Sequence, residues 1–419
     1  LVSGRQTHRL PSDPAALGTL ARRLGFGDAR ELRGQLELTT DAVAAIFATL
    51  GDEKGYRPEI AVLLDPRTDR AAAETALAGL GFREPAEAAF QIELLRRRPS
   101  SPLGPSASPS TTRVAPALLE EVAASPDPDQ ALRLAVDFAA RSFGEGIWRL
   151  LDENRALLRL LASLFGTSAF LAKSFVSHPE LLDALLLEGR GGPRRTRADL
   201  EAAVDARIAG ADPQDAQNTL RRVKTEELLR IGLADVAGEL PLESVLEQLS
   251  DLADVCLARV FELVRSTAEA RGLRAPPLAV LGLGKLGARE LGYAGDLDLV
   301  FVYQGGVDEH EAAARLAQRL VSALGAFLEE GRLYEVDTRL RPSGQQGTLV
   351  SSVEAWLDYH RSSAQLWERQ ALIRCRAVAG DPVLGSHLER EAERFVYAEG
   401  TDARTVGDAI ARMRERIEK

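Results

Sequence analysis

The sequence has 419 residues, of which 45% are hydrophobic and 27% charged, and its formal net charge is −10. The length predicts roughly two to three domains, and the composition is that of a globular protein rather than a disordered one. The acidic balance disfavours a general nucleic-acid binder, which needs a basic face for the phosphate backbone. No apolar stretch approaches the ~18 residues of a membrane span. We therefore expect neither a nucleic-acid nor a membrane partner.

Cysteine usage and the chain ends indicate the compartment. Cys256 and Cys375 are far apart in the sequence, which favours neither a disulfide framework nor a cysteine-rich metal site. Each is expected to be a small core residue on a helix. The first residues lack a charged-then-apolar signal pattern, so we predict a cytoplasmic protein. Because the chain starts at Leu1 and stops inside an amphipathic pattern, we expect a piece of a longer protein.

The first two thirds of the chain are predicted to be helical. Within residues 1–98, apolar residues recur at helical spacing from Asp13 to Leu50, and Ser12 or Asp13 can cap the start. Residues 99–117 are rich in Pro and Ser, which predicts an extended, flexible linker. Residues 118–272 again repeat apolar residues at helical spacing and predict a helical domain.

The hydrophobic period changes in residues 273–385. Short apolar runs bounded by Gly predict buried strands at Pro277–Leu283 and Leu297–Tyr303, and shorter ones at Leu333–Asp337 and 347–352. A helix is expected between Asp308 and Glu330, with Asp308 and Glu311 as a capping box, and another is expected to start at Ser351 with Glu354. Residues 386–419 begin a further helical region. The predicted fold class is α+β, mostly helical, with a small sheet flanked by helical bundles.

Two carboxylates in the second predicted strand are the strongest chemical signal. Asp296 and Asp298 are separated by one residue, so on a strand both side chains point to the same face. Like charges held that close repel, and hard divalent cations such as Mg²⁺ relieve the repulsion by binding carboxylate oxygens. Asp337, at the end of the next predicted strand, could complete the ligands of two metal ions, which suits in-line displacement at phosphorus. A solvated loop is the simpler alternative, but ionised carboxylates beside an apolar core are costly without a partner.

The flanking motifs are compatible with phosphate binding. Upstream, Gly284 and Lys285 lie in a glycine-rich turn that can bring backbone N–H groups and an ammonium close to phosphates. The GxxxxGK[ST] order of a P-loop is absent. Downstream, Arg339 and Arg341 could neutralise a triphosphate, although a solvated basic turn would look the same. Residues 367–370 and Arg374 could line the pocket, but a helix face with a Glu–Arg pair is the preferred interpretation.

Three stretches together resemble the glutamine synthetase adenylyltransferase family, a bifunctional regulator of bacterial nitrogen assimilation. They are VLGLGKLGARELGYAGDLDLVFVY, LYEVDTRLRPSGQQGTLVSS and WERQALIRCRAVAGD. In this family each half carries a nucleotidyltransferase domain of the DNA polymerase β type. The segment YEVDTRLRPSG resembles that of the second, adenylylating copy. Residues 1–98 would then end the preceding half, 118–272 would lead into the catalytic unit at 273–385, and 386–419 would begin a truncated C-terminal region.

The resemblance implies transfer of AMP from ATP to a tyrosine hydroxyl of glutamine synthetase, with Mg²⁺ as the metal. Asp296, Asp298 and Asp337 would be metal ligands, and Gly284 and Lys285 would hold the triphosphate. Gly295 stands where the family usually has Ser, which could loosen phosphate binding without removing a metal ligand. Regulation by a PII signal protein is expected to involve regions beyond this chain.

Other functions fit the same residues. The adenylyl-removing half of the family would use the same carboxylates with phosphate as nucleophile, so residue types alone do not separate the two directions. A catalytically silent nucleotide-binding module is a second alternative, which the three intact carboxylates disfavour. A polymerase acting on nucleic acid would need a basic groove, which the net acidity disfavours.

Overall fold

The structure is a computed structural model that describes residues 13–35, 56–99, 101–105, 107, 109–141, 146–178, 194–328, 330–397 and 403–417. The chain forms two compact units, Leu1–Val62 and Leu63–Lys419. Each is described separately below. Within these described ranges, no helix is both long enough and apolar enough to cross a membrane.

The first unit is built around helix α1 (Pro14–Arg23). The carboxylate of Asp13 accepts a hydrogen bond of 2.9 Å from the Ala16 N–H, which confirms Asp13 as the predicted N-cap. Leu17, Ala21 and Leu32 form a small buried cluster. Residues 29–35 are helical, and the remainder of the helical prediction, 36–50, lies outside the described residues. Helix α3 (Pro58–Leu64) spans the division between the units.

The second unit begins with a helical bundle whose core is partly aromatic. The ring of Phe138 lies 5.7–5.9 Å, between centroids, from the rings of Trp148, Phe165 and Phe175. Such close offset or edge-on ring pairs add stability beyond the buried area. The helices of the bundle are α4 (Arg70–Leu80), α5 (Pro85–Arg97), α6 (Pro109–Ala123), α7 (Pro128–Arg141), α8 (Gly146–Glu153), α9 (Arg155–Thr167) and α10 (Ala169–Ser177).

The prediction of an extended linker over 99–117 is wrong for its second half, where α6 begins at Pro109. Val114 and Leu118 are buried one turn apart on the face of α6, which contacts α8 and α9. Earlier in the segment, the Ser101 side chain is fully buried and donates a hydrogen bond to the Leu95 carbonyl. Burial of an apolar helix face therefore outweighs the local preference of Pro and Ser for extended chain.

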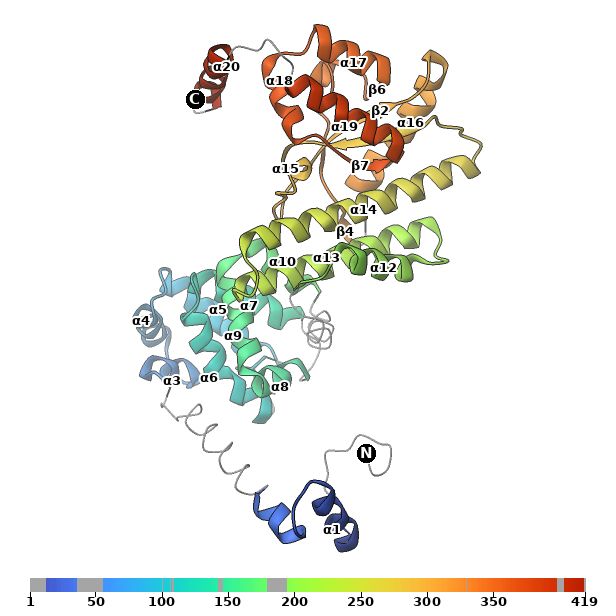
Figure 1. Ribbon diagram of the computed structural model, residues 1–419. Helices are drawn as coiled ribbons and strands as arrows, with labels where there is room; N and C mark the ends of the chain where they lie inside the picture. The colour runs from blue at the N-terminus through green and yellow to red at the C-terminus, as the bar shows by residue number, and fades with distance from the viewer. Residues whose placement is uncertain are drawn as a thin grey trace. The chain divides into compact units, whose positions relative to one another are not determined.

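Three further helices, α12 (Arg197–Ile208), α13 (Pro213–Val236) and α14 (Leu242–Ala270), confirm the helical prediction for the described part of 118–272. The two long helices α13 and α14 pack against each other (Figure 1). Helix α13 also contacts α9 and α10 of the bundle, whereas α14 contacts strand β7 and helix α16. This pair of helices thus supports the sheet.

The sheet contains five strands in the order β5-β2-β1-β7, with β6 also paired to β2. Strands β1 and β7 are antiparallel to their neighbours, whereas β5 and β6 run parallel to β2 along the same edge. The predicted strands at 277–283 and 297–303 are confirmed, the other two are shorter than expected, and β7 was not predicted. The strands are β1 (Leu278–Gly282), β2 (Leu297–Tyr303), β5 (Val336–Asp337), β6 (Val350–Ser352) and β7 (Arg376–Gly380).

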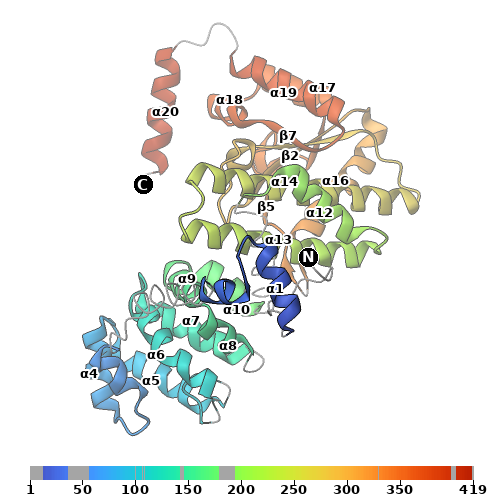
Figure 2. The same cartoon turned by 60° about the horizontal axis from the view of Figure 1, so that its bottom comes forward.

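Both faces of this small mixed sheet are covered. Leu281 and Val302 belong to a core cluster with Trp356 of α17 (Val353–Ser362) and Leu388 of α19 (Pro382–Val396). Figure 2 shows α17 and α19 on one side of the sheet and α14 on the other. Because successive residues alternate between faces, Asp298 lies on the same face of β2 as Val302, at the end of the strand.

Three local predictions in this region are wrong. The helix expected to reach Glu330 is α16 (His310–Gly325), and two short antiparallel strands follow it, β3 (Phe327–Leu328) and β4 (Gly331–Arg332). Glu311 pairs with Arg315 instead of forming a capping box with Asp308. The N-cap of α17 is Ser352, which accepts from the Ala355 N–H, so the cap was placed one residue too early. Short turns of this kind are set by hydrogen bonds that residue type alone does not specify.

A fully buried arginine fixes α13 to the end of α16. The Arg221 guanidinium donates hydrogen bonds of 2.7, 3.2 and 3.0 Å to the carbonyls of Ala323, Ala326 and Gly331. These carbonyls lie at the last turn of α16 and at β4, where helix and strand ends leave acceptors without partners. One side chain of α13 therefore donates hydrogen bonds to the carbonyls at the start of the segment that leads to β5.

We predict that Arg221→Met destabilises the second unit by about 3 kcal/mol or more, because several buried carbonyls lose their donor at once. The neighbouring substitution Arg222→Met is the matched control: Arg222 is 57% exposed and forms an ion pair of 3.4 Å with Glu330, so its loss should cost less than about 1 kcal/mol. Chemical denaturation followed by circular dichroism measures both. Equal losses for the two variants would contradict the assigned role of Arg221.

Candidate active site

Three aspartates meet where β2 starts. Asp296 directly precedes β2, Asp298 is its second residue and Asp337 ends β5. The parallel pairing of the two strands places Asp298 opposite Asp337, and neighbouring strands lie about 4.8 Å apart. Paired residues in this register point to the same face of the sheet, so the three predicted carboxylates gather at one edge.

The carboxylates differ in their electrostatic surroundings. Burial raises the pKa of Asp298 above its ordinary value, and the nearby charges of Asp296 and Asp337 raise it further. Asp337 shows the opposite shift: the hydrogen bond from the Arg339 side chain lowers its pKa. The Arg339 Nε lies 2.7 Å from Asp337 Oδ2, and its backbone N–H lies 2.8 Å from Oδ1. The charge of Asp337 is thus neutralised within the chain, whereas that of Asp298 is not.

The donor set suits a hard cation, although the described side chains form no ready-made cluster of three metal ligands. All three groups offer carboxylate oxygens, which Mg²⁺ and similar ions prefer. Arg339 occupies part of the ligand capacity of Asp337, and its side chain is 68% exposed. Because an exposed side chain can rotate away at small cost, Asp337 can exchange this guanidinium for a metal ion.

The glycine-rich turn lies directly against Asp298. It forms the short helix α15 (Gly284–Gly287), and the Leu283 N–H donates to the Asp298 carbonyl over 2.9 Å. Gly284 has φ +54°, and a Cβ there would come within 2.1 Å of Asp298 Oδ2, so only glycine permits this approach. A Cβ at Gly287 would come within 1.7 Å of the Arg374 carbonyl. The exposed Lys285 is close enough to oppose the pKa shift of Asp298.

An open cavity of about 490 Å³ adjoins the carboxylates, with Asp296, Asp337, Arg339 and Arg341 in its wall. The two arginines in this wall behave differently. Arg341 donates hydrogen bonds of 2.8 and 2.7 Å to the carbonyl and hydroxyl of Thr338, which hold the turn after β5 together. Phosphate binding by Arg341 stays a prediction, and Arg339 is the arginine whose exposed side chain adjoins the carboxylates.

In the stretch 367–370, Glu368 makes a structural contact, but its partner differs from the one expected. Glu368 of α18 (Leu366–Ala371) accepts a hydrogen bond of 2.6 Å from the Tyr359 hydroxyl rather than pairing with an arginine. Arg374 forms an ion pair of 3.1 Å with Glu290, just after the glycine-rich turn. Cys256 is a buried residue of α14, as predicted, whereas Cys375 precedes β7 and is not helical.

Sequence reasoning missed the buried ion pair that positions the glycine-rich turn. Asp254 of α14 is fully buried, and its carboxylate accepts from Arg376 of β7 over 2.6 and 3.0 Å. Arg376 also donates to the carbonyls of Leu286 and Gly287 over 2.9 and 3.4 Å. The available signal was a carboxylate inside a long apolar helical pattern, which demands a partner.

Comparisons with known proteins show the family to which the chain belongs. The family model for glutamate-ammonia ligase adenylyltransferase matches residues 158–391, and the chain belongs to this family. The chain is 34% identical over 443 residues to a protein of Methylococcus capsulatus and 35% identical over 445 residues to one of Ralstonia nicotianae. Both are named bifunctional glutamine synthetase adenylyltransferase/adenylyl-removing enzyme. Each match covers 99% of this chain but 46% or 45% of the relative, so the chain spans about half their length.

We predict that Asp298→Asn stabilises the metal-free protein at neutral pH and abolishes stabilisation by Mg²⁺. The pKa of Asp298 is raised by burial and by its charged neighbours, so its ionised form costs stability above that pKa, and the gain on substitution should fade as the pH drops towards the ordinary value of 3.8. Thermal unfolding with EDTA or Mg²⁺, at several pH values, measures both effects. Asp308→Asn, at an exposed position, is the control. If Asp298→Asn kept the wild-type response to Mg²⁺, metal binding at Asp298 would be contradicted.

Removal of the Asp254 carboxylate should disturb the glycine-rich turn as well as the core. We predict a loss of about 3 kcal/mol for Asp254→Asn, because the largely buried Arg376, whose side chain is 21% exposed, loses its counter-ion. Asp205→Asn removes a similar two-point pair with Arg259, but Asp205 is 53% exposed, so the cost should stay below about 1 kcal/mol. Hydrogen exchange of residues 283–288 should accelerate only in the Asp254 variant. Unchanged exchange there would show that the pair does not hold the turn.

Proposed function

We propose that this chain catalyses transfer of AMP from ATP to a tyrosine hydroxyl of glutamine synthetase. The observation that carries the proposal is the register of β2 and β5, which sets Asp298 opposite Asp337 and beside Gly284. Membership of the glutamate-ammonia ligase adenylyltransferase family supports the reaction class. The names of the relatives support glutamine synthetase as the protein substrate. We further propose that the small mixed sheet is a nucleotidyltransferase sheet of the DNA polymerase β type.

Asp296, Asp298 and Asp337 would hold two Mg²⁺ ions, which when bound neutralise the charge that develops on the attacking and leaving oxygens. The half-buried position of Asp298 and the repulsion from its neighbours favour exchange of a proton for a cation. The α15 turn and Lys285 would hold the triphosphate next to these carboxylates. Arg339 would leave Asp337 and bind a phosphate oxygen, since its guanidinium is exposed and lies at the same cavity.

The transfer itself would be an in-line displacement at the α-phosphorus. The tyrosine oxygen forms a bond to that phosphorus, the bond to the bridging oxygen breaks, and pyrophosphate leaves with the electron pair. Once Arg339 has left it, the ionised carboxylate of Asp337 can accept a hydrogen bond from the incoming hydroxyl and orient it. The hydroxyl proton would pass to Asp337 or to solvent.

The adenylylating direction is proposed because YEVDTRLRPSG resembles the second copy of the catalytic domain in the family. The reverse, phosphorolytic direction would place phosphate where pyrophosphate leaves and would use the same carboxylates. The two directions therefore differ in the nucleophile supplied and not in the residues at the metal site, and only an assay run both ways separates them.

The decisive assay incubates the chain with Mg²⁺, labelled ATP and unmodified glutamine synthetase. Label should appear on the synthetase with the wild-type chain and fall to background with the combined Asp296→Ala and Asp298→Ala substitutions, while Asp308→Ala keeps wild-type activity. A parallel reaction supplies phosphate and pre-adenylylated synthetase. ADP formed only in that reaction would show that the chain works in the removing direction. A folded chain with neither signal would refute autonomous catalysis.

A further inference from the structure

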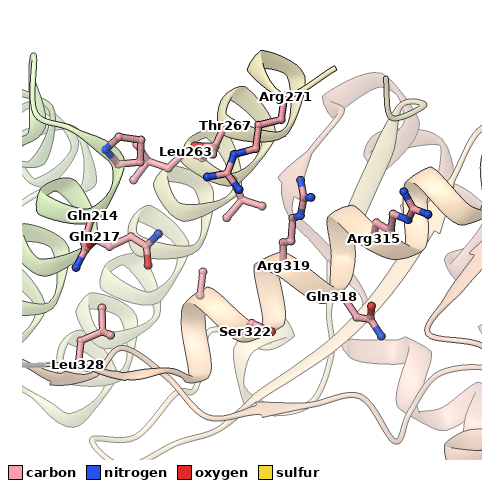
Figure 3. A pocket seen from close by; sticks show the side chains of 13 residues that line it. Gln214, Gln217, Leu263, Thr267, Arg271, Arg315, Gln318, Arg319, Ser322 and Leu328 are labelled. Carbon is pink, nitrogen blue, oxygen red and sulfur yellow. The ribbon is translucent and has the colours of Figure 1, made fainter. Parts of the chain in front are cut away.

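A second cavity, of about 740 Å³, lies away from the carboxylates between α13, α14 and α16. None of its lining residues belongs to the cavity beside Asp296 and Asp337. Its volume falls within the range of pockets that hold small molecules. Figure 3 shows its labelled polar side chains, with Gln217 from α13, Arg271 at the end of α14, and Arg319 from α16. The apolar part of the wall comes from Leu263, Val264 and Leu328.

The charge of this cavity is one-sided. Among the residues that the structure describes, three arginines, Arg271, Arg315 and Arg319, line it and no aspartate or glutamate does, in a chain whose net charge is −10. Arg315 has a counter-ion, because its Nη2 lies 2.5 Å from Glu311 on the same helix. Among the residues that the structure describes, no carboxylate pairs with the guanidinium of Arg271 or Arg319. Within the described part of the chain, two positive charges are therefore left without a counter-ion in one hollow.

The two uncompensated guanidinium groups point into the hollow from different helices. In Figure 3 the side chains of Arg271, at the end of α14, and Arg319, on α16, both extend into the space between the helices. Arg319 also lies four residues after Arg315, a spacing at which like charges repel on a helix. An anion with several oxygens would balance the charges of Arg271 and Arg319 together, since planar guanidinium groups bind such oxygens in pairs.

We propose that this cavity is a binding site for a small organic polyanion, of the phosphate-ester or polycarboxylate class. Arg271 and Arg319 bind its charged oxygens. The amides of Gln214, Gln217 and Gln318 and the hydroxyl of Ser322 offer neutral hydrogen bonds, and the leucines and Val264 contact its carbon skeleton. The site is independent of the proposed catalytic function, because it shares no residue with the carboxylate edge.

The cavity is tied to the segment that ends at Asp337. Ala323 and Leu328 line it, and the carbonyl of Ala323 is one of those that Arg221 holds. Ten residues separate α16 from β5, and the Tyr334 N–H in this connection donates to the Leu324 carbonyl over 3.1 Å. A ligand that contacts Arg319 therefore touches the helix from which β5 and Asp337 follow.

Isothermal titration calorimetry of the whole chain in EDTA, without ATP, tests the proposal. The probes are pyrophosphate and citrate at constant ionic strength, which supply the phosphate oxygens of the first ligand class and the carboxylate oxygens of the second. We expect one saturable site for at least one probe, weakened roughly tenfold or more by Arg271→Gln and by Arg319→Gln, since each removes a charge-assisted contact. Both side chains are exposed, so neither substitution threatens the fold.

Two control variants test whether the probe binds in this cavity or at other basic groups of the chain. Arg265→Gln makes the same charge change on α14, where Arg265 pairs with Glu262 and Glu269 outside the cavity, and should alter affinity less than twofold. Arg339→Gln changes the carboxylate edge and should also leave affinity unchanged. If Arg265→Gln weakened probe binding as much as the cavity variants, the probe would be responding only to the net surface charge, and the proposal would be wrong. Loss of binding with Arg339→Gln alone, or no saturable binding by either probe, would overturn the proposal.

Discussion

The buried carboxylate of Asp254 is the constraint on which the sheet and the candidate site depend. It lies within α14 with no exposed surface, and three arginines from separate parts of the chain surround it, Arg376 on β7, Arg197 at the start of α12 and Arg289 after α15. A buried charge without partners costs several kcal/mol, so arrangements that leave this aspartate unpaired are strongly disfavoured. Because Arg376 also binds the carbonyls of the glycine-rich turn, the same pairing fixes a helix, a strand and the candidate phosphate-binding turn.

The two groups of aspartates show opposite uses of charge. Asp254 is neutralised by arginines, and the result is a rigid connection. Asp298 is half-buried next to two further carboxylates, and burial, followed by the charges of these neighbours, raises its pKa. Asp337 is intermediate in charge compensation, because it has a counter-ion, Arg339, and the side chain of that arginine is exposed. A site meant to bind a cation has to keep its negative charge incompletely compensated, and such uncompensated charge near a core is the kind of local strain expected at functional positions.

Sequence reasoning located the strands whose apolar pattern is visible within a short stretch of the sequence. β1 and β2 are continuous apolar runs bounded by glycine, and Asp296 and Asp298 stand out because the two-residue period of a strand puts both on one face. β7 was missed because RAVAG has no such run and becomes a strand by pairing with β1, almost a hundred residues earlier in the chain. The first part of α6 was missed because residue preference pointed to a linker while burial against α8 and α9 decided the outcome. Asp254 and Arg376 lie 122 residues apart, so no spacing rule could pair them.

The position of Asp337 depends on helices that contribute nothing to the carboxylate edge. β5 has only two residues, and its pairing with β2 is correspondingly short, so the register is held mainly by what precedes it. Upstream, Arg221 of α13 binds the last turn of α16 and β4, and Lys224 of the same helix lies 5.0 Å from the ring of Tyr334, three residues before Asp337. Any displacement of α16 along α13 must therefore change the approach of Asp337 to Asp298. The long helical layer is consequently part of the site geometry, and the sheet alone would not set the third carboxylate in place.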